Sequence, residues 1–287
     1  MMQRQAQWVL IFLIGLLAAA IGWPVGRPAA AEVPVPSATS PADEQHLVYL
    51  PLVFKAPDAC EPIPGVSYIT LSVVEGYEPG KPPPERNPDY RLSLLGYYPV
   101  NEYRGLVYYA QSNDPNIPPQ FTTLLEDQPT PPIVNTYQAH GWDWSDHRPI
   151  YPAPWTWPPV SVLGLRTAPK AIVRVPDSSY VPGTDCGDGG CDALVLYASR
   201  WEVTLRYARE DDLFPGYTVY IVGICAEPSL QTLYEQMNAQ GRSKLPAVRG
   251  GQPIGRAWGS EIAIAIRDNG SFIDPRDCDS FWKGYCP

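Results

Sequence analysis

The sequence predicts a mainly β protein, built from antiparallel sheets in a sandwich or barrel-like arrangement, with one short helix and proline-rich loops. The composition is the first reason, because 35 prolines, 23 glycines, 18 tyrosines and 9 tryptophans favour strands, turns and extended segments. Strand-like runs separated by turn residues recur roughly every ten residues after Val160. Residues 261–267 then alternate strictly, which places Ile262, Ile264 and Ile266 on one face of a half-buried strand.

The N-terminal 31 residues have the pattern of a secretory signal peptide. Arg4 precedes an apolar run over residues 8–22, and Ala29–Ala31 supply a small-residue cleavage site. An uncleaved membrane anchor is the alternative. In that case this N-terminal segment is the part of the chain that we expect to contact a membrane. Residues 32–59 begin as a Pro/Ala/Ser-rich linker and end in an apolar run that either docks onto the body or acts as a tether.

Two folded regions follow the linker. Residues 60–159 form an aromatic, proline-rich β region, in which we expect strands at 68–74, 90–98 and 106–110. Residues 160–287 form a C-terminal β domain with disulfides, and its strands are expected at 171–175, 193–198, 201–208 and 217–225.

One helix interrupts these strands at about 229–240. Ser229 is a suitable N-cap, apolar residues recur at helical spacing from Leu230 to Met237, and Gly241 ends the helix. After the alternating strand, Asp268–Ser271 supplies the positive φ angles of a tight hairpin, so that residues 271–273 return as its partner.

Six cysteines in an exported chain predict up to three disulfides. Spacing favours two local pairs and leaves one long-range pair: Cys186 with Cys191, Cys278 with Cys286, and Cys60 with Cys225. The Cys-x-x-Cys spacing of a zinc site does not occur.

Charge and motifs narrow the function. A net charge of −9 without a basic patch argues against nucleic acid and anionic lipid as partners. Asp143 and Asp146 lie between His140 and His147, but this is not the spacing of a recognised metal site. Neither a G-x-S-x-G elbow nor a phosphate-binding glycine loop is present. We therefore assign no catalytic residue, metal or cofactor.

The C-terminal half carries a family resemblance. GGQPIGRA, a strand, and then RDNGSFIDP are similar to the C-terminal part of lysostaphin-type zinc metallopeptidase domains, which are secreted β domains acting on peptidoglycan cross-links. The match covers residues 249–275 well and the preceding part loosely. The region also resembles uncharacterised secreted bacterial proteins, and this second resemblance implies no particular function.

Carried onto this sequence, the resemblance implies a degenerate site. The family's H-x-H zinc ligands fall on Glu261 and Ala263, and Gln236 takes the place of its catalytic histidine. Because alanine has no ligand atom, the resemblance implies a non-catalytic, peptidase-like relative without zinc.

Aromatic residues give the strongest binding signal. Trp142 and Trp144 are two residues apart, as are Trp155 and Trp157, so each pair projects to one side of an extended segment. With Asp143 and Arg148 beside them, these rings form a candidate platform for stacking on sugars; packing against prolines in a core is the alternative. The leading hypothesis is an exported, non-catalytic module of the cell surface that binds cell-wall glycan or a protein surface. The competing hypotheses are a secreted hydrolase, either a peptidoglycan peptidase or a glycosidase, and a purely structural surface-layer component.

Overall fold

The structure is a computed structural model that describes residues 60–73, 82–109, 118–150, 158–179, 190–209 and 212–287. The chain divides into two compact units, Met1–Val53 and Phe54–Pro287, and all the described residues belong to the second. The predicted signal peptide over residues 1–31 and the linker over residues 32–59 lie outside the described residues.

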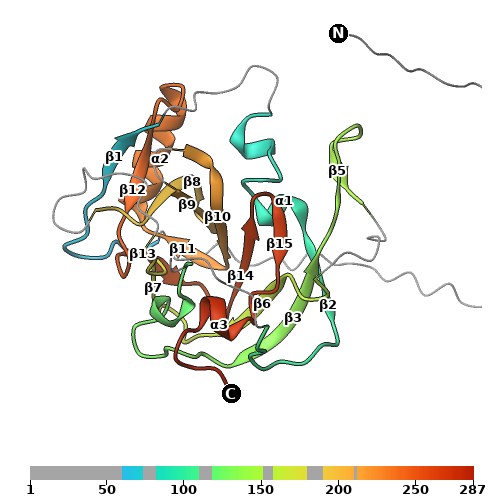
Figure 1. The fold of residues 1–287 in the computed structure, drawn as a ribbon. Coiled ribbons are helices and arrows are strands. Elements are labelled where there is room, and N and C mark those ends of the chain that lie inside the picture. The colour runs from blue at the N-terminus through green and yellow to red at the C-terminus, as the bar shows by residue number, and fades with distance from the viewer. Residues whose placement is uncertain (1–59, 74–81, 110–117, 151–157, 180–189, 210–211) are drawn as a thin grey trace, which may run out of the picture. The chain divides into compact units, whose positions relative to one another are not determined.

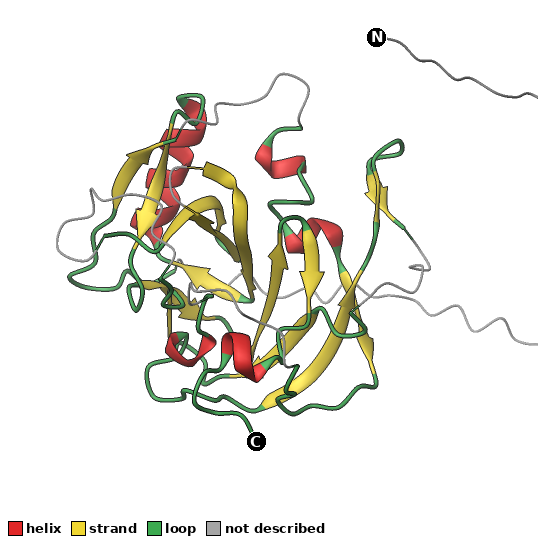
Figure 2. Cartoon of the chain, viewed as in Figure 1, coloured by secondary structure: helices red, strands yellow, loops and turns green. Residues whose placement is uncertain are grey.

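The described residues are mainly β, as predicted: strands account for 41% of them and helices for 14%, so sheets set the architecture (Figure 2). The sheets are antiparallel, as predicted, and they do not close into a barrel within the described residues. No helix among the described residues is long and apolar enough to span a membrane.

A large sheet of ten strands organises the unit (Figure 1). Its strand order is β1 (Ile69–Ser72), β12 (Lys244–Val248), β8 (Ala193–Ser199), β9 (Glu202–Arg209), β10 (Asp212–Val222), β14 (Glu261–Asp268), β6 (Val162–Arg166), β3 (Ile133–Ala139) and β2 (Tyr97–Val100), with β15 (Ser271–Ile273) paired to β14. Strands of the predicted regions 60–159 and 160–287 thus share one sheet.

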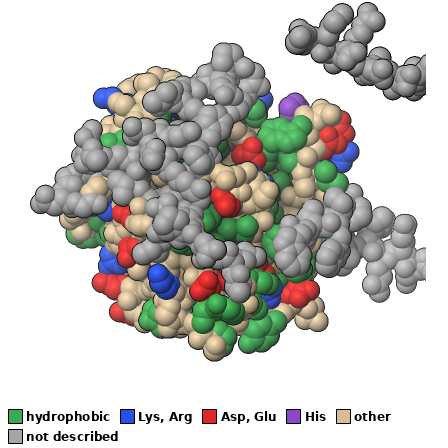
Figure 3. Space-filling model, in the orientation of Figure 1, with side chains coloured by type: hydrophobic (Ala, Val, Ile, Leu, Met, Phe, Trp, Pro, Cys, Tyr) green, Lys and Arg blue, Asp and Glu red, His purple; other side chains and the backbone are tan. Residues whose placement is uncertain are grey.

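Smaller elements complete the unit. A second sheet has the order β11 (Ile224–Ala226), β13 (Pro253–Ala257) and β7 (Ile172–Arg174), and β4 (Trp142–Asp143) forms a hairpin with β5 (Arg148–Pro149). The helices are α1 (Leu92–Leu95), α2 (Pro228–Ala239) and α3 (Cys278–Phe281), with short 3₁₀ turns η1 (Pro84–Arg86) and η2 (Phe121–Thr123). Acidic and basic side chains are intermixed on the face drawn in Figure 3, with hydrophobic side chains exposed between them.

The two faces of β14 define the two sides of the large sheet. As predicted, Ile262, Ile264 and Ile266 point together into the main core; we call this side the core face. The opposite side, called the Glu261 face, also carries Ala263 and Ala265, which the prediction of a half-buried strand leaves exposed. Both alanines are buried, at 6% and 0% exposure, because Leu92 and Leu95 of α1 pack in the same cluster. The half-buried interpretation is therefore wrong at the centre of the strand.

The hairpin after β14 is confirmed. Asp268 pairs with Ser271 across a two-residue turn in which Asn269 and Gly270 both have positive φ. Two central residues with positive φ are the requirement of a tight turn that matches the twist of the strands, which explains the Asn-Gly sequence.

The predicted helix is present as α2, but its cap differs. Glu227, not Ser229, is the N-cap: its carboxylate accepts hydrogen bonds from the backbone N–H groups of Ser229 and Leu230. Pro228 then takes the first helical position, where a missing N–H costs nothing. Figure 1 shows α2 beside β12 and β8, against which it packs.

The expected strand at 90–98 is wrong. The segment instead forms α1, a turn at Gly96 with φ of 76°, and then β2. Leu92 and Leu95, three residues apart, are both buried on the same side of the turn, so helical spacing governs burial there.

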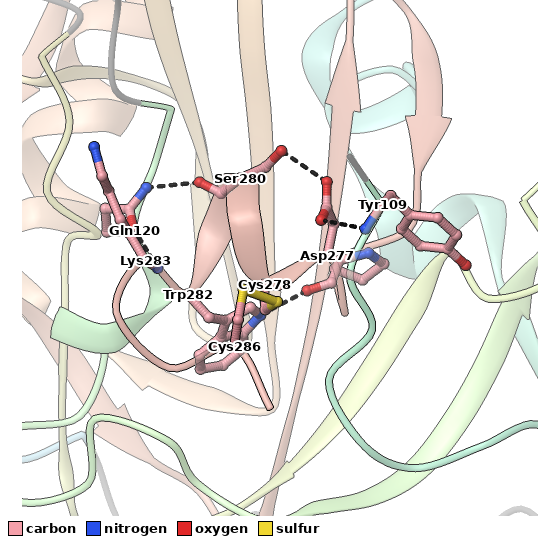
Figure 4. The surroundings of a disulfide bond; sticks show 9 residues. Tyr109, Gln120, Asp277, Cys278, Ser280, Trp282, Lys283 and Cys286 are labelled. Atoms are coloured by element: carbon pink, nitrogen blue, oxygen red, sulfur yellow. Dashed lines mark hydrogen bonds between the residues drawn. A yellow bond between two sulfur atoms is a disulfide. The ribbon is translucent and has the colours of Figure 1, made fainter. Parts of the chain in front are cut away.

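Two of the predicted disulfides are present. Cys60 is bonded to Cys225 in β11, with Cα atoms 5.5 Å apart, and Cys278 is bonded to Cys286. In Figure 4 the second disulfide closes the C-terminal loop beside the buried ring of Trp282. For the third predicted pair, Cys186 lies outside the described residues, so its bond to Cys191 is not described.

Candidate functional site

A carboxylate with fixed partners stands on the Glu261 face. Glu261 is the first residue of β14, and its side chain crosses β6 to reach β3. There the hydroxyl of Tyr137 donates a hydrogen bond to Oε1 at 2.7 Å, and the Asn135 amide donates to Oε2 at 2.7 Å. Asn135 and Tyr137 point to the same side because they are two residues apart on one strand.

Gly164 on β6 makes this reach possible. A Cβ atom at Gly164 would lie 2.1 Å from Oε1 of Glu261, a distance that no side chain tolerates. The glycine is paired with Asn135 on one side and Ala263 on the other, so it lies directly beneath the carboxylate. The absence of a side chain at this position therefore creates the space that the Glu261 carboxylate occupies.

The electrostatics keep the partners of Glu261 in their donor form. Burial, together with the hydrogen bond and negative charge of Glu261, raises the pKa of Tyr137, so this phenol stays protonated at neutral pH. Burial also raises the pKa of Tyr97, with further contributions from the charges of Glu261 and Glu202. The rings of Tyr97 and Tyr137 meet edge to face with centroids 5.1 Å apart.

The Glu261 carboxylate has hydrogen-bond acceptor sites that its protein partners do not use, and these could bind a ligand. Glu261 forms no ion pair with another residue in the described part of the chain, and it is partly exposed. A carboxylate has about four lone-pair sites, of which Tyr137 and Asn135 use two. Glu261 is thus a fixed acceptor that retains capacity for the hydroxyl or N–H groups of a ligand.

Aromatic rings pack on the same face of the sheet as this acceptor. Tyr97, Tyr137 and Trp142 are partly buried against one cluster on the Glu261 face, whose buried members are Leu92, Leu95, Ala139, Val162, Tyr220, Ala263 and Ala265. Trp142 of the predicted platform and Glu261 therefore share one side of the sheet, which no sequence pattern indicates.

The structure describes half of the predicted platform. Trp142 and Trp144 are brought together, with ring centroids 6.4 Å apart and an edge-to-face arrangement, and Trp144 is 50% exposed. Trp155 and Trp157 lie outside the described residues. The indole N–H of Trp142 is buried and has no hydrogen-bond partner in the described structure.

The two polar residues of the predicted platform stabilise its hairpin. Asp143 accepts hydrogen bonds from the backbone N–H groups of Ser145 and Asp146 through Oδ1, at 2.9 and 3.2 Å. The Arg148 guanidinium forms an exposed ion pair with Asp146 at 3.0 Å. Both side chains hold the turn between β4 and β5 and thereby position Trp144.

A second acid on the same face is structural. Glu202, at the start of β9, has no solvent exposure; it accepts hydrogen bonds from the backbone N–H of Ser93 at 3.1 Å and from its hydroxyl at 2.5 Å. Because Arg91 supplies no side-chain cap to α1, Glu202 acts as the cap from a distant strand. Burial raises the pKa of Glu202, against the hydrogen bonds from Ser93 and the charge of Arg91.

Sequence reasoning identifies Glu261 only as the position of a missing zinc ligand, and it does not identify Asn135. The available signal is the spacing Asn-x-Tyr on a strand, but only the register of β3 against β6 and β14 shows which acid these residues meet.

The described residues contain no group of three or more His, Cys, Asp or Glu side chains arranged to hold a metal ion. In comparisons with known proteins, no family model, no curated protein and no solved structure matches the chain.

Proposed function

We propose that this chain is an exported, non-catalytic module of the cell surface that binds a glycan through the Glu261 face. The observation that carries the proposal is the Glu261 carboxylate, fixed by Tyr137 and Asn135 among aromatic rings. Sugar rings combine apolar C–H faces with hydroxyl donors, so they fit a site of flat aromatic surfaces and a few oriented polar groups.

The arrangement supports binding more than hydrolysis. Glycoside hydrolysis uses two carboxyl groups that flank the scissile bond. Among the described residues on the Glu261 face, the other acid near Tyr97 is Glu202, which is fully buried and bonded to Ser93. An accessible carboxylate whose neighbouring acid is buried supports ligand recognition more than hydrolysis. The resemblance of residues 249–275 to lysostaphin-type domains, which act on peptidoglycan cross-links, favours peptidoglycan as the polymer that is bound.

The disulfides Cys60–Cys225 and Cys278–Cys286 are compatible with an extracellular protein, because such bonds persist in oxidising compartments. Together with the signal-like N-terminus of the sequence, they support export as part of the proposal.

Retention of the full chain on insoluble peptidoglycan and on a panel of polysaccharides tests the function. We expect wild type to be retained and Glu261→Gln to bind roughly tenfold more weakly, since a hydrogen bond to a charged group contributes about 1.5–3 kcal/mol. Glu235→Gln, an exposed acid on α2, is the matched control and should bind as wild type does.

A second variant tests the aromatic platform. Replacing Trp142, Trp144, Trp155 and Trp157 together by alanine should abolish retention, whereas Trp144→Ala removes only the exposed ring and should weaken it. Circular dichroism must show each variant folded. Absence of retention for wild type on every polymer, or unchanged retention of Glu261→Gln and of the fourfold variant, would overturn the proposal.

A further inference from the structure

Two tryptophans and an arginine meet where three turns converge at one end of the strands. Arg200 and Trp201 form the turn between β8 and β9, and Trp258 lies between β13 and β14. The indole rings of the tryptophans contact edge to face, with centroids 4.5 Å apart and an interplanar angle of 75°. The Arg200 guanidinium carbon lies 5.0 Å from the Trp201 ring centroid and 5.9 Å from that of Trp258. We call these three residues the Trp-Arg corner.

Backbone hydrogen bonds fix the Trp-Arg corner. Gly223, between β10 and β11, donates its N–H to the Trp201 carbonyl at 3.0 Å and accepts the Trp258 N–H at 2.9 Å. Ala226 donates its N–H to the Arg200 carbonyl at 3.1 Å. Each of the three residues is thus tied through its main chain to the segment Gly223–Ala226, so the rings are presented on a preformed support.

The Trp-Arg corner remains accessible although backbone hydrogen bonds hold it in place. Trp201 is 40% exposed, and Trp258 and Arg200 are partly exposed. A large indole surface left open to solvent, beside a second ring and a guanidinium, has the chemistry of a stacking subsite for a pyranose ring.

Two further arginines lie on chain segments next to the Trp-Arg corner, although the protein as a whole has a net charge of −9. Arg166 is exposed at the end of β6, and the following residue, Thr167, bonds through its N–H and hydroxyl to the turn that follows Trp258. Arg256 precedes Trp258 by two residues and binds the Lys170 carbonyl. Neither Arg166 nor Arg256 forms an ion pair with another residue in the described ranges, whereas Lys170 pairs with Glu61.

The Trp-Arg corner also adjoins the Glu261 site. Trp258 lies three residues before Glu261, Arg166 is the cross-strand neighbour of Glu261, and a Cβ atom on Gly223 would lie 3.2 Å from the Glu261 carbonyl. We expect a glycan bound at the Glu261 carboxylate to extend its neighbouring sugar units toward the Trp-Arg corner, because Trp258 and Arg166 both flank Glu261.

We propose that the Trp-Arg corner is a subsite for acidic sugar units, in which a uronate ring stacks on Trp201 and its carboxylate pairs with the surrounding guanidinium groups. The subsite rests on the proposed glycan-binding function and specifies the ligand as an acidic polysaccharide. A guanidinium binds a carboxylate through paired N–H donors, which gives the stacked ring a defined orientation. The same electrostatic attraction makes the affinity for an acidic glycan fall as salt is added.

Calorimetric titration of the full chain tests the subsite, with polygalacturonate oligomers, reduced neutral oligomers of the same length, and a phosphate-bearing glycan as ligands. We expect the uronate oligomer to bind at least about tenfold more tightly than the neutral one, the difference that one charge-assisted contact supplies. Arg200→Gln should remove most of this preference and leave the affinity for the neutral oligomer nearly unchanged. Trp201→Ala removes the stacking surface, so it should weaken the binding of both oligomers and also reduce the preference. If Arg200→Lys loses the uronate preference to the same extent as Arg200→Gln, the paired N–H donors of the guanidinium matter as well as its positive charge.

Two control variants separate a local effect from a general one. Tyr108→Ala removes a ring that is 61% exposed outside the Trp-Arg corner, and Arg249→Gln removes an exposed charge at the residue after β12. Neither should change the ratio of uronate to neutral affinity.

The outcomes distinguish the subsite from the broader function. Equal binding of acidic and neutral oligomers, or a uronate preference unaltered by Trp201→Ala and Arg200→Gln, would overturn the subsite and leave the glycan-binding proposal standing. Tighter binding of the phosphate-bearing glycan than of the uronate would overturn the assignment to uronate. If no glycan binds at all, both proposals are wrong.

Discussion

The long-range disulfide should stabilise the fold far more than the short one. Cys60 and Cys225 are separated by 165 positions, whereas Cys278 and Cys286 are separated by 8. In the chain-entropy description, a disulfide lowers the conformational entropy of the unfolded state. The reduction grows with the logarithm of the number of residues in the loop that the disulfide closes. The first loop corresponds to about 5 kcal/mol of folding free energy and the second to about 2.5 kcal/mol.

The paired variants Cys60→Ala/Cys225→Ala and Cys278→Ala/Cys286→Ala test this difference of about 2.5 kcal/mol. Guanidinium unfolding followed by tryptophan fluorescence gives the free energy of unfolding for each, with the remaining disulfides intact. Because Cys278 is fully buried, its replacement also leaves a small cavity, which narrows the expected gap.

The result that would refute the reasoning is a smaller loss of stability for Cys60→Ala/Cys225→Ala than for Cys278→Ala/Cys286→Ala. That outcome would mean that the unfolded chain is already compact around the N-terminal segment, or that the bond strains the native state, since both effects cancel loop entropy.

Two further predictions concern the cap of α1 and the β14–β15 turn. Glu202→Ala should cost about 2–3 kcal/mol by leaving the Ser93 N–H without its acceptor, while Glu202→Gln retains an acceptor. Burial raises the pKa of Glu202 in the folded state, so the wild type should lose stability relative to Glu202→Gln as pH rises above about 4.3. Urea unfolding at several pH values measures the difference in the free energy of unfolding. A difference that stays constant or grows in favour of the wild type would contradict the prediction. Gly270→Ala should cost about 1 kcal/mol, because φ is +93° although the added Cβ has open space, whereas Gly259→Ala, also with open space but no positive φ, should be nearly neutral. Equal effects in thermal unfolding would show that φ is not the cause.

Local chemistry was enough to predict several elements from the sequence. The alternation of residues 261–267 fixes which side chains of β14 share a face, and Asn269-Gly270 specifies the turn, because both depend only on backbone geometry within a few residues. Cysteine spacing indicated the two described disulfides for a similar reason: short loops pair locally, and Cys60 and Cys225 are what remain.

Long-range partners decided the rest. The segment 90–98 becomes α1 and β2 because Glu202, more than a hundred positions away, caps the turn and the sheet buries Leu92 and Leu95. Sequence alone established the mainly β class and the isoleucine face, since these follow from composition and period. Only the tertiary structure placed Asn135 and Tyr137 on Glu261 and joined Arg200, Trp201 and Trp258, because register and turn convergence arise from contacts between segments that are distant in the chain.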